Sequence, residues 1–153
     1  MRESSRGRRL GVDVGKVRVG VAISDPDGIL ATPVATVARD LSAEPDKVPG
    51  DMVEIVRLMT DHDVVQIIVG LPVQLSGTEG AAAIDIRAYS ERLAKAVWPV
   101  PIALADERMS TVVATRRLAE RGVRGRRQRA VVDQAAAVEI LQSWLDAQRR
   151  QSR

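Results

Sequence analysis

The chain has 153 residues, of which 45% are hydrophobic and 28% are charged. This length predicts one domain with a core built from a sheet and helices. No apolar run approaches the roughly 18 residues that cross a membrane, and no signal-peptide core follows the basic N-terminus, so we expect a cytoplasmic protein. Cysteine is absent and His62 is the only histidine. Disulfides, thiol nucleophiles and thiolate zinc sites are therefore excluded, and histidine-based catalysis would depend on His62 alone.

The net charge of +3 is unevenly distributed along the chain. Residues 116–129 hold one acid, Glu120, and seven arginines: Arg116, Arg117, Arg121, Arg124, Arg126, Arg127 and Arg129. Residues 40–63 hold seven acids against Lys47 and Arg57: Asp40, Glu44, Asp46, Asp51, Glu54, Asp61 and Asp63. A polyanion would meet a positive end of the molecule. The arginine cluster is equally compatible with a solvated face.

Two strands are predicted at the start of the chain, at residues 10–15 and 18–24, because large apolar side chains alternate there with small ones. Asp13 shares its face of the first strand with Gly11 and Gly15, and Gly20 and Ala22 form the matching face of the second. If the strands form a hairpin, this face leaves space beside the Asp13 carboxylate. A closely packed helix, a metal or a substrate backbone could occupy that space.

The rest of the chain alternates between helical and extended patterns. The further predicted elements are strands at 29–37, 64–70 and 102–107, and helices at 51–61, about 79–97, 111–122 and 130–147. Pro33 indicates an edge strand or a bulge, and Ser76 with Glu79, or Thr78 alone, is expected to cap the helix before residue 97. This order predicts an α/β fold with a mixed five-stranded sheet and helices on both faces.

Three acids lie in apolar surroundings far apart in the sequence: Asp13, Glu107 and Asp133. Such carboxylates must be neutralised, paired or bound to a metal. Strand alternation favours Glu107 over Asp106 for the face of small residues, and helical spacing places Asp133 on an apolar stripe. Ion pairs, or a favourable charge in the first turn of a helix for Asp133, would also explain them. The three together predict a site for a divalent metal.

Five stretches resemble those of one known family, the RuvX/YqgF proteins of the RNase H-like nuclease superfamily. They occur in the family's order and span nearly the whole chain: 10–22 (LGVDVGKVRVGVA), 69–72 (VGLP), 77–80 (GTEG), 106–111 (DERMST) and 132–137 (VDQAAA). The resemblance implies a single RNase H-like nuclease domain over residues 1–153, with 1–7 and 148–153 expected to be flexible. It implies a hydrolase, a Mg²⁺- or Mn²⁺-dependent endonuclease that cleaves phosphodiester bonds.

The resemblance also implies roles for individual residues. Asp13, Glu107 and Asp133 would be the catalytic carboxylates that bind the metal. Arg18 and Arg108 match family motif positions and would either steer phosphate or pair with the acids. The basic segment would hold the nucleic-acid backbone by charge, through Arg124, Arg126, Arg127 and Arg129.

The family offers two substrates, the 5′ end of precursor 16S ribosomal RNA and a four-way DNA (Holliday) junction. Aromatic residues are only 2% of the chain, so a base-stacking platform is hard to build and recognition of duplex shape is favoured. We favour rRNA processing over a junction resolvase. A non-catalytic ribosome- or polymerase-binding protein and an ATP-binding module remain as alternatives. A homodimer, which a resolvase needs, and a monomer are both compatible with the apolar helix at about 79–97.

Overall fold

The computed structural model describes residues 6–42, 44–114 and 125–152, without the side chains of 126 and 127. Its centre is a five-stranded sheet in the order β3-β2-β1-β4-β5. The strands are β1 (Arg9–Val14), β2 (Arg18–Ser24), β3 (Ala31–Ala38), β4 (Gln66–Leu71) and β5 (Ile102–Asp106). Because β2 is antiparallel to β1 and β3, while β4 is parallel to β1 and β5, the sheet is mixed as predicted.

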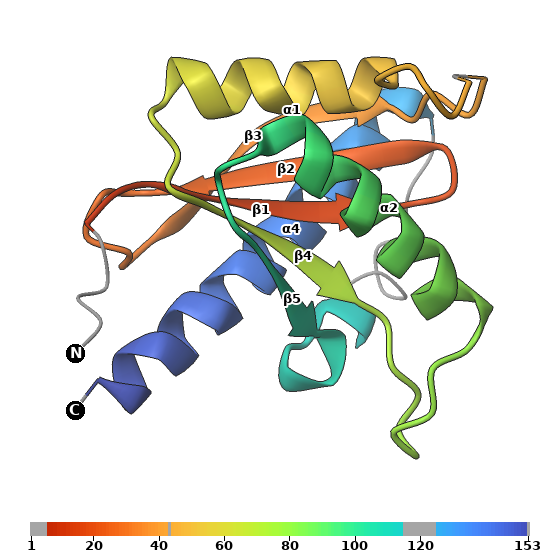
Figure 1. Ribbon diagram of the computed structural model, residues 1–153. Helices are drawn as coiled ribbons and strands as arrows, with labels where there is room; N and C mark the ends of the chain where they lie inside the picture. The colour runs from red at the N-terminus through yellow and green to blue at the C-terminus, as the bar shows by residue number, and fades with distance from the viewer. Residues whose placement is uncertain (1–5, 43, 115–124, 153) are drawn as a thin grey trace.

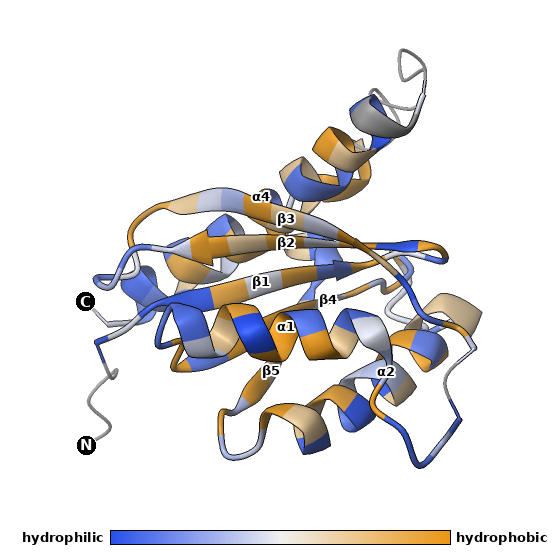
Figure 2. Ribbon diagram, turned by 90° about the horizontal axis from the view of Figure 1, so that it is seen from above, coloured by the Kyte–Doolittle hydropathy of each residue, from blue (hydrophilic) through white to orange (hydrophobic). Residues whose placement is uncertain are grey.

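Helices cover both faces of this sheet, which confirms the predicted α/β architecture. The helices are α1 (Gly50–Asp61), α2 (Ala81–Val97), the short 3₁₀ helix η1 (Glu107–Met109) and α4 (Arg126–Gln151). Figures 1 and 2 show α1 and α2 together on one side of the sheet and α4 on the other. Within the described residues, none of the helices combines the length and apolarity needed to span a membrane.

Three strands end side by side at one end of the sheet. β1, β4 and β5 are parallel neighbours, so their carboxyl ends lie next to one another.

β3 is an edge strand of the sheet, and its register against β2 shifts where Pro33 pairs with Ala22. The prediction of an edge strand with a bulge at Pro33 is therefore confirmed. Proline is accommodated there because it has no N–H to donate to a central ladder.

The two faces of the sheet differ in the size of their side chains. Leu10, Val12, Val19 and Val21 are buried in the core that α1 and α2 cover. The opposite face carries glycine and alanine, and α4 packs on it so closely that a Cβ added to Gly20 would lie within 3.0 Å of the Asp133 backbone. Of the three occupants considered for this small-residue face, the structure shows the closely packed helix.

Several predicted boundaries were wrong. The last helix was placed at 130–147, but α4 starts at Arg126 and ends at Gln151. Its start was missed because arginines in a first turn oppose the helix dipole. Residues 148–151, expected to be flexible, are helical, and the Arg149 guanidinium donates to the carbonyls of Gly28 and Ile29. Of the predicted helix at 111–122, residues 112–114 are helical and 115–122 lie outside the described residues.

The start of α2 also differs from the prediction. No side chain caps this helix, and its N-cap residue is Gly80. The expected caps are engaged elsewhere, because the Ser76 hydroxyl bonds to Thr78 and Glu79 pairs with Arg87.

Gly20→Ala is expected to destabilise the protein by about 1–3 kcal/mol, the usual cost of forcing extra atoms into a packed core. The added methyl group would collide with the backbone of α4 rather than with a flexible side chain. Urea denaturation would measure the free energy of unfolding. Gly50→Ala is the matched control, because its Cβ would meet its nearest atom at 3.7 Å, an ordinary contact distance. Equal stability of the two variants would contradict the close approach of α4.

Candidate active site

A cavity of about 550 Å³ opens at the edge where β1, β4 and β5 end. All three predicted site acids line it, each from a different element: Asp13 from β1, Glu107 from η1 and Asp133 from α4. The other lining residues come from the β1–β2 turn, the segment after β4 and the first turns of α2: Val14, Gly15, Lys16, Pro72, Ala81, Ala82, Asp85 and Ile86. The fold thus brings together residues that are 120 positions apart in the sequence.

Two glycines beside Asp13 allow this convergence. Gly20 pairs with Asp13 across the β1–β2 ladder, and the Asp133 backbone lies where a Gly20 side chain would stand. On the other side of β1, Gly70 follows Val69, which pairs with Val12. A Cβ on Gly70 would lie 2.6 Å from the Ile140 side chain and 3.0 Å from a carboxylate oxygen of Glu107. The absence of side chains at these two positions therefore lets Asp133 and Glu107 approach Asp13.

The donor set fits a hard divalent cation, since carboxylate oxygens are the ligands that Mg²⁺ prefers. Asp13 and Glu107 are 6% and 5% exposed. The geometry is less complete than the chemistry: within the described residues, no three acidic or histidine side chains lie close enough together to hold one ion. The Asp133 carboxylate accepts a hydrogen bond from the Arg18 guanidinium at 2.6 Å.

The choice between Asp106 and Glu107 follows from their surroundings. Asp106 does not line the acidic cavity but a smaller, apolar one of about 150 Å³ beside Trp144. Its carboxylate accepts hydrogen bonds from the backbone and guanidinium of Arg108, and the guanidinium lowers the pKa of Asp106. Glu107 begins η1 and lies in the acidic cavity. The placement thus agrees with the preference for Glu107.

Of the cationic residues predicted to bind substrate, two form ion pairs, one is exposed, and the others lie wholly or in their side chains outside the described residues. Arg18 pairs with Asp133 and Arg108 with Asp106, so the structure shows the pairing alternative for both. Arg124 and the side chains of Arg126 and Arg127 lie outside the described residues, while Arg129 is exposed in the first turn of α4.

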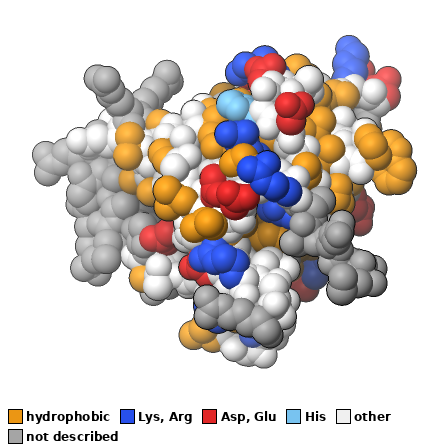
Figure 3. Space-filling view, turned by 90° about the vertical axis from the view of Figure 1, so that its left-hand side faces the viewer, with side chains coloured by type: hydrophobic (Ala, Val, Ile, Leu, Met, Phe, Trp, Pro, Cys, Tyr) orange, Lys and Arg blue, Asp and Glu red, His pale blue; other side chains and the backbone are white. Residues whose placement is uncertain are grey.

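The single histidine does not line the cavity that holds Asp13, Glu107 and Asp133. His62 ends α1 and is exposed. Figure 3 shows it among acidic and basic side chains, at the end of the molecule opposite to the one toward which β1 runs in Figure 1.

Asp85 and its partner Arg39 were not predicted from the sequence. Two nitrogens of the Arg39 guanidinium donate to the two Asp85 oxygens at 2.9 Å each, and this pair lowers the pKa of Asp85 and raises that of Arg39. Arg39 Nη1 also donates to the Gly15 carbonyl at 3.1 Å. It therefore joins the end of β3 to both the β1–β2 turn and α2. Helical spacing of Ala81, Ala82 and Asp85 was the available sequence signal, but it does not identify the partner strand.

A buried tyrosine supports the same wall of the cavity. The Arg39 guanidinium lies 5.3 Å from the centre of the Tyr89 ring, within range of a cation–π interaction. The Tyr89 hydroxyl donates to buried Asp51 at 2.5 Å, and the other Asp51 oxygen accepts from the Asp40 backbone N–H. Burial, followed by the hydrogen bond to Asp51, raises the pKa of Tyr89. α1, α2 and the end of β3 are thus joined through polar contacts.

The sheet order, the helices on both faces and the carboxylates at the ends of β1 and β5 define an RNase H-like α/β fold. The profile of the RuvX family, described as Holliday junction resolvase, matches residues 7–147, and the chain belongs to this family. A Rhodococcus erythropolis protein named "Putative pre-16S rRNA nuclease" is 52% identical over 97% of this chain and 82% of its own length. A Nocardia farcinica protein of the same name is 53% identical over 94% and 80%.

A solved structure supports the fold independently. T. thermophilus RuvC in complex with a Holliday junction substrate superimposes with a TM-score of 0.57 over 95% of this chain and 97% of RuvC, at 12% identity. At that identity the likeness establishes the fold alone. The family and the fold predicted from the sequence are therefore both confirmed.

Tyr89 is the only tyrosine in the chain, so its ionisation can be followed directly. We expect no phenolate absorbance from the native protein near pH 10, where an unperturbed tyrosine titrates at about 10, whereas the urea-unfolded chain shows it. Because the unfolded state loses this proton first, the raised pKa contributes stability below about pH 10 that is lost as the pH rises further. Tyr89→Phe should remove the signal. Native ionisation near pH 10 would contradict the burial of the hydroxyl.

Proposed function

We propose that this protein is a metal-dependent endonuclease in which Asp13, Glu107 and Asp133 are the catalytic and metal-binding carboxylates. The observation that carries the proposal is the convergence of these three acids on one cavity in a member of the RuvX family. The names of the relatives and the RuvC-like fold support a hydrolase that acts on nucleic acids. The site offers no histidine, so carboxylates must carry the chemistry.

Mg²⁺ or Mn²⁺ is the cofactor that this donor set fits best. When bound, such a cation supplies an activated water and stabilises the charge that develops on the phosphate. Asp13 and Glu107 are held in place by the strands and by η1, so they offer fixed oxygen ligands. Asp133 joins them only if its carboxylate exchanges the Arg18 guanidinium for the metal. Substrate phosphate oxygens would complete the coordination that the protein leaves open.

The basic end of α4 is the proposed contact for the nucleic-acid backbone. Asp133 lies about two turns into this helix, so the helix begins on the order of 10 Å along its axis from this acid. We propose phosphate contacts for Arg126, Arg127 and Arg129 of its first turn, and for Arg124, which lies outside the described residues. Once released from their carboxylates, Arg18 and Arg108 would add charge at the same edge. Such contacts hold the backbone without reading its sequence.

Precursor 16S ribosomal RNA is the proposed substrate, because relatives that match almost the whole chain carry that name. A four-way DNA junction is the second candidate, and the description of the matching family favours it. Both offer duplex, which suits a chain with three aromatic residues, Tyr89, Trp98 and Trp144. The two candidates differ in stoichiometry, since resolving a junction takes two symmetric cuts.

Asp13→Asn is expected to abolish Mn²⁺-dependent cleavage and leave substrate binding intact. It removes one negative charge from the acidic cavity, so the melting temperature without metal should be unchanged or higher. Mn²⁺ should raise the melting temperature of the wild type more than that of the variant, because ligand binding stabilises the folded state. Asp46→Asn, at an exposed loop position, is the matched control. Normal cleavage by Asp13→Asn would remove this residue from the mechanism.

Cleavage of labelled precursor rRNA and of a four-way junction, measured side by side, would separate the two substrates. We expect the wild type with Mn²⁺ to shorten the 5′ end of the RNA. Light scattering over a range of concentrations, with and without the junction, would report the oligomeric state in parallel. A resolvase requires an isologous dimer on the junction. A strict monomer that trims the RNA would exclude the resolvase, and symmetric junction cuts by a dimer would exclude the preference for RNA. A wild type that binds without cutting either would support the non-catalytic alternative.

A further inference from the structure

Lys16 is placed differently from the other cationic residues near the acids. It lies in the turn between β1 and β2, is exposed, and lines the acidic cavity. Among the cavity's lining residues in the described chain it is the only cation, beside Asp13, Asp85, Glu107 and Asp133. No hydrogen bond or ion pair engages its ammonium group within the described residues.

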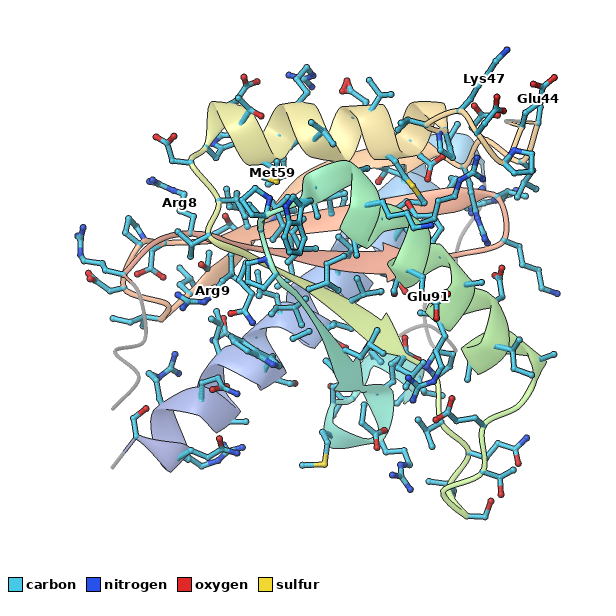
Figure 4. The ribbon with its side chains drawn as sticks, in the orientation of Figure 1. Arg8, Arg9, Glu44, Lys47, Met59 and Glu91 are labelled. Carbon is cyan, nitrogen blue, oxygen red and sulfur yellow. The ribbon has the colours of Figure 1, made fainter. Side chains whose placement is uncertain are left out.

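The neighbouring arginines already have acidic partners. Arg18 pairs with Asp133 at 2.6 Å, Arg108 with Asp106 at 2.6 Å, and Arg39 with Asp85 at 2.9 Å. Arg8 and Arg9 are at the start of β1, at the opposite end of this strand from Asp13 (Figure 4). Among the described residues that line this cavity, Lys16 is therefore the cation that can meet an anion without first leaving a carboxylate.

The backbone that carries Lys16 is held on both sides. The Gly15 N–H donates to the Arg18 carbonyl at 2.8 Å and closes the turn. The Arg39 N–H donates to the Val17 carbonyl at 2.9 Å, and its side chain donates to the Gly15 carbonyl. The Arg39 side chain is 11% exposed and packs against Tyr89. The turn is thus fixed, while the Lys16 side chain above it extends freely.

A phosphodiester that approaches Asp13 and Glu107 meets negative charge of its own sign. One cation at the mouth of the cavity reduces that repulsion and favours a phosphate there. Lysine suits such a position because its ammonium group is a compact point charge on a flexible stem, whereas arginine prefers the bidentate pairs seen at Asp85.

We propose that Lys16 binds a backbone phosphate of the nucleic-acid substrate at the mouth of the acidic cavity, and that Arg39 is the positioning residue that holds its turn. This inference rests on the proposed function and adds a specific substrate contact to it. Lys16 binds, in this view, before and independently of any metal.

Binding measured without metal tests the contact. Affinities of wild type, Lys16→Ala and Lys16→Arg for a duplex RNA and a four-way DNA would be recorded in EDTA over a range of salt. For Lys16→Ala, the slope of log affinity against log salt, which is negative, should become shallower by about 0.7–0.9, the loss of one phosphate contact. Lys16→Arg should keep the wild-type slope. Lys95→Ala is the matched control, because this exposed lysine lies ten residues, about 15 Å along α2, beyond Asp85.

Arg39→Lys tests the positioning role, because it keeps the charge and loses the fork of two hydrogen bonds. We expect it to lower the salt slope as Lys16→Ala does, and to lower it no further in the double variant. A lower melting temperature with an unchanged slope would show that Arg39 is only structural. If the variant does not fold, Lys16→Ala still tests the contact.

The outcomes separate this inference from the proposed function. An unchanged slope for Lys16→Ala, in a wild type that cleaves with Mn²⁺, would overturn the Lys16 contact alone. A lower slope in a protein that cuts no nucleic acid would support the contact and overturn the nuclease. A wild type that binds neither substrate would overturn both.

Discussion

The contact between α4 and the glycine at position 20 is the constraint on which the site depends. Side chains normally fill the space between a helix and the sheet on which it packs. Here the helix backbone at Asp133 occupies the space of the missing Gly20 side chain, directly beside Asp13. The space of the missing Gly70 side chain is taken by the Ile140 side chain of α4 and by a Glu107 carboxylate oxygen. Close packing at two glycines therefore contributes to the positions of Asp133 and Glu107 beside Asp13.

Arginines from other elements pair with two of the acids that line the cavity. β2 supplies the partner of Asp133, and the segment after β3 supplies the partner of Asp85. Partly exposed pairs of this kind contribute little to stability, typically about 0–1 kcal/mol. Their effect is to fix where each carboxylate points. The two acids with the least exposure, Asp13 and Glu107, remain in the middle of the site.

Much of this arrangement could be predicted from the sequence. Alternation between large and small residues in the first two strands identified both the buried face and the face that receives a helix. The spacing of Asp133 along an apolar helix identified its direction. Those patterns are local and periodic, so they can be recognised in the sequence without knowledge of the fold.

Other features depend on contacts between distant segments and could not be predicted in this way. Arg39 and Asp85 are 46 residues apart, and their pairing follows from the placement of α2 beside the end of β3. That Gly70 leaves room for the Glu107 carboxylate is visible only in the folded structure. The start of α4 was misplaced because its first-turn arginines oppose the dipole. Its tertiary contacts with the sheet outweigh that preference.

The Arg18–Asp133 pair links the β1–β2 turn to α4. The Arg18 carbonyl accepts the hydrogen bond that closes the turn, and the Arg18 guanidinium donates to the Asp133 carboxylate on α4. A cation that bound the Asp133 carboxylate in place of this guanidinium would leave a free positive charge at the edge of the same cavity. Binding of a metal and attraction for a phosphate would then reinforce each other, and each would raise the affinity of the site for the other.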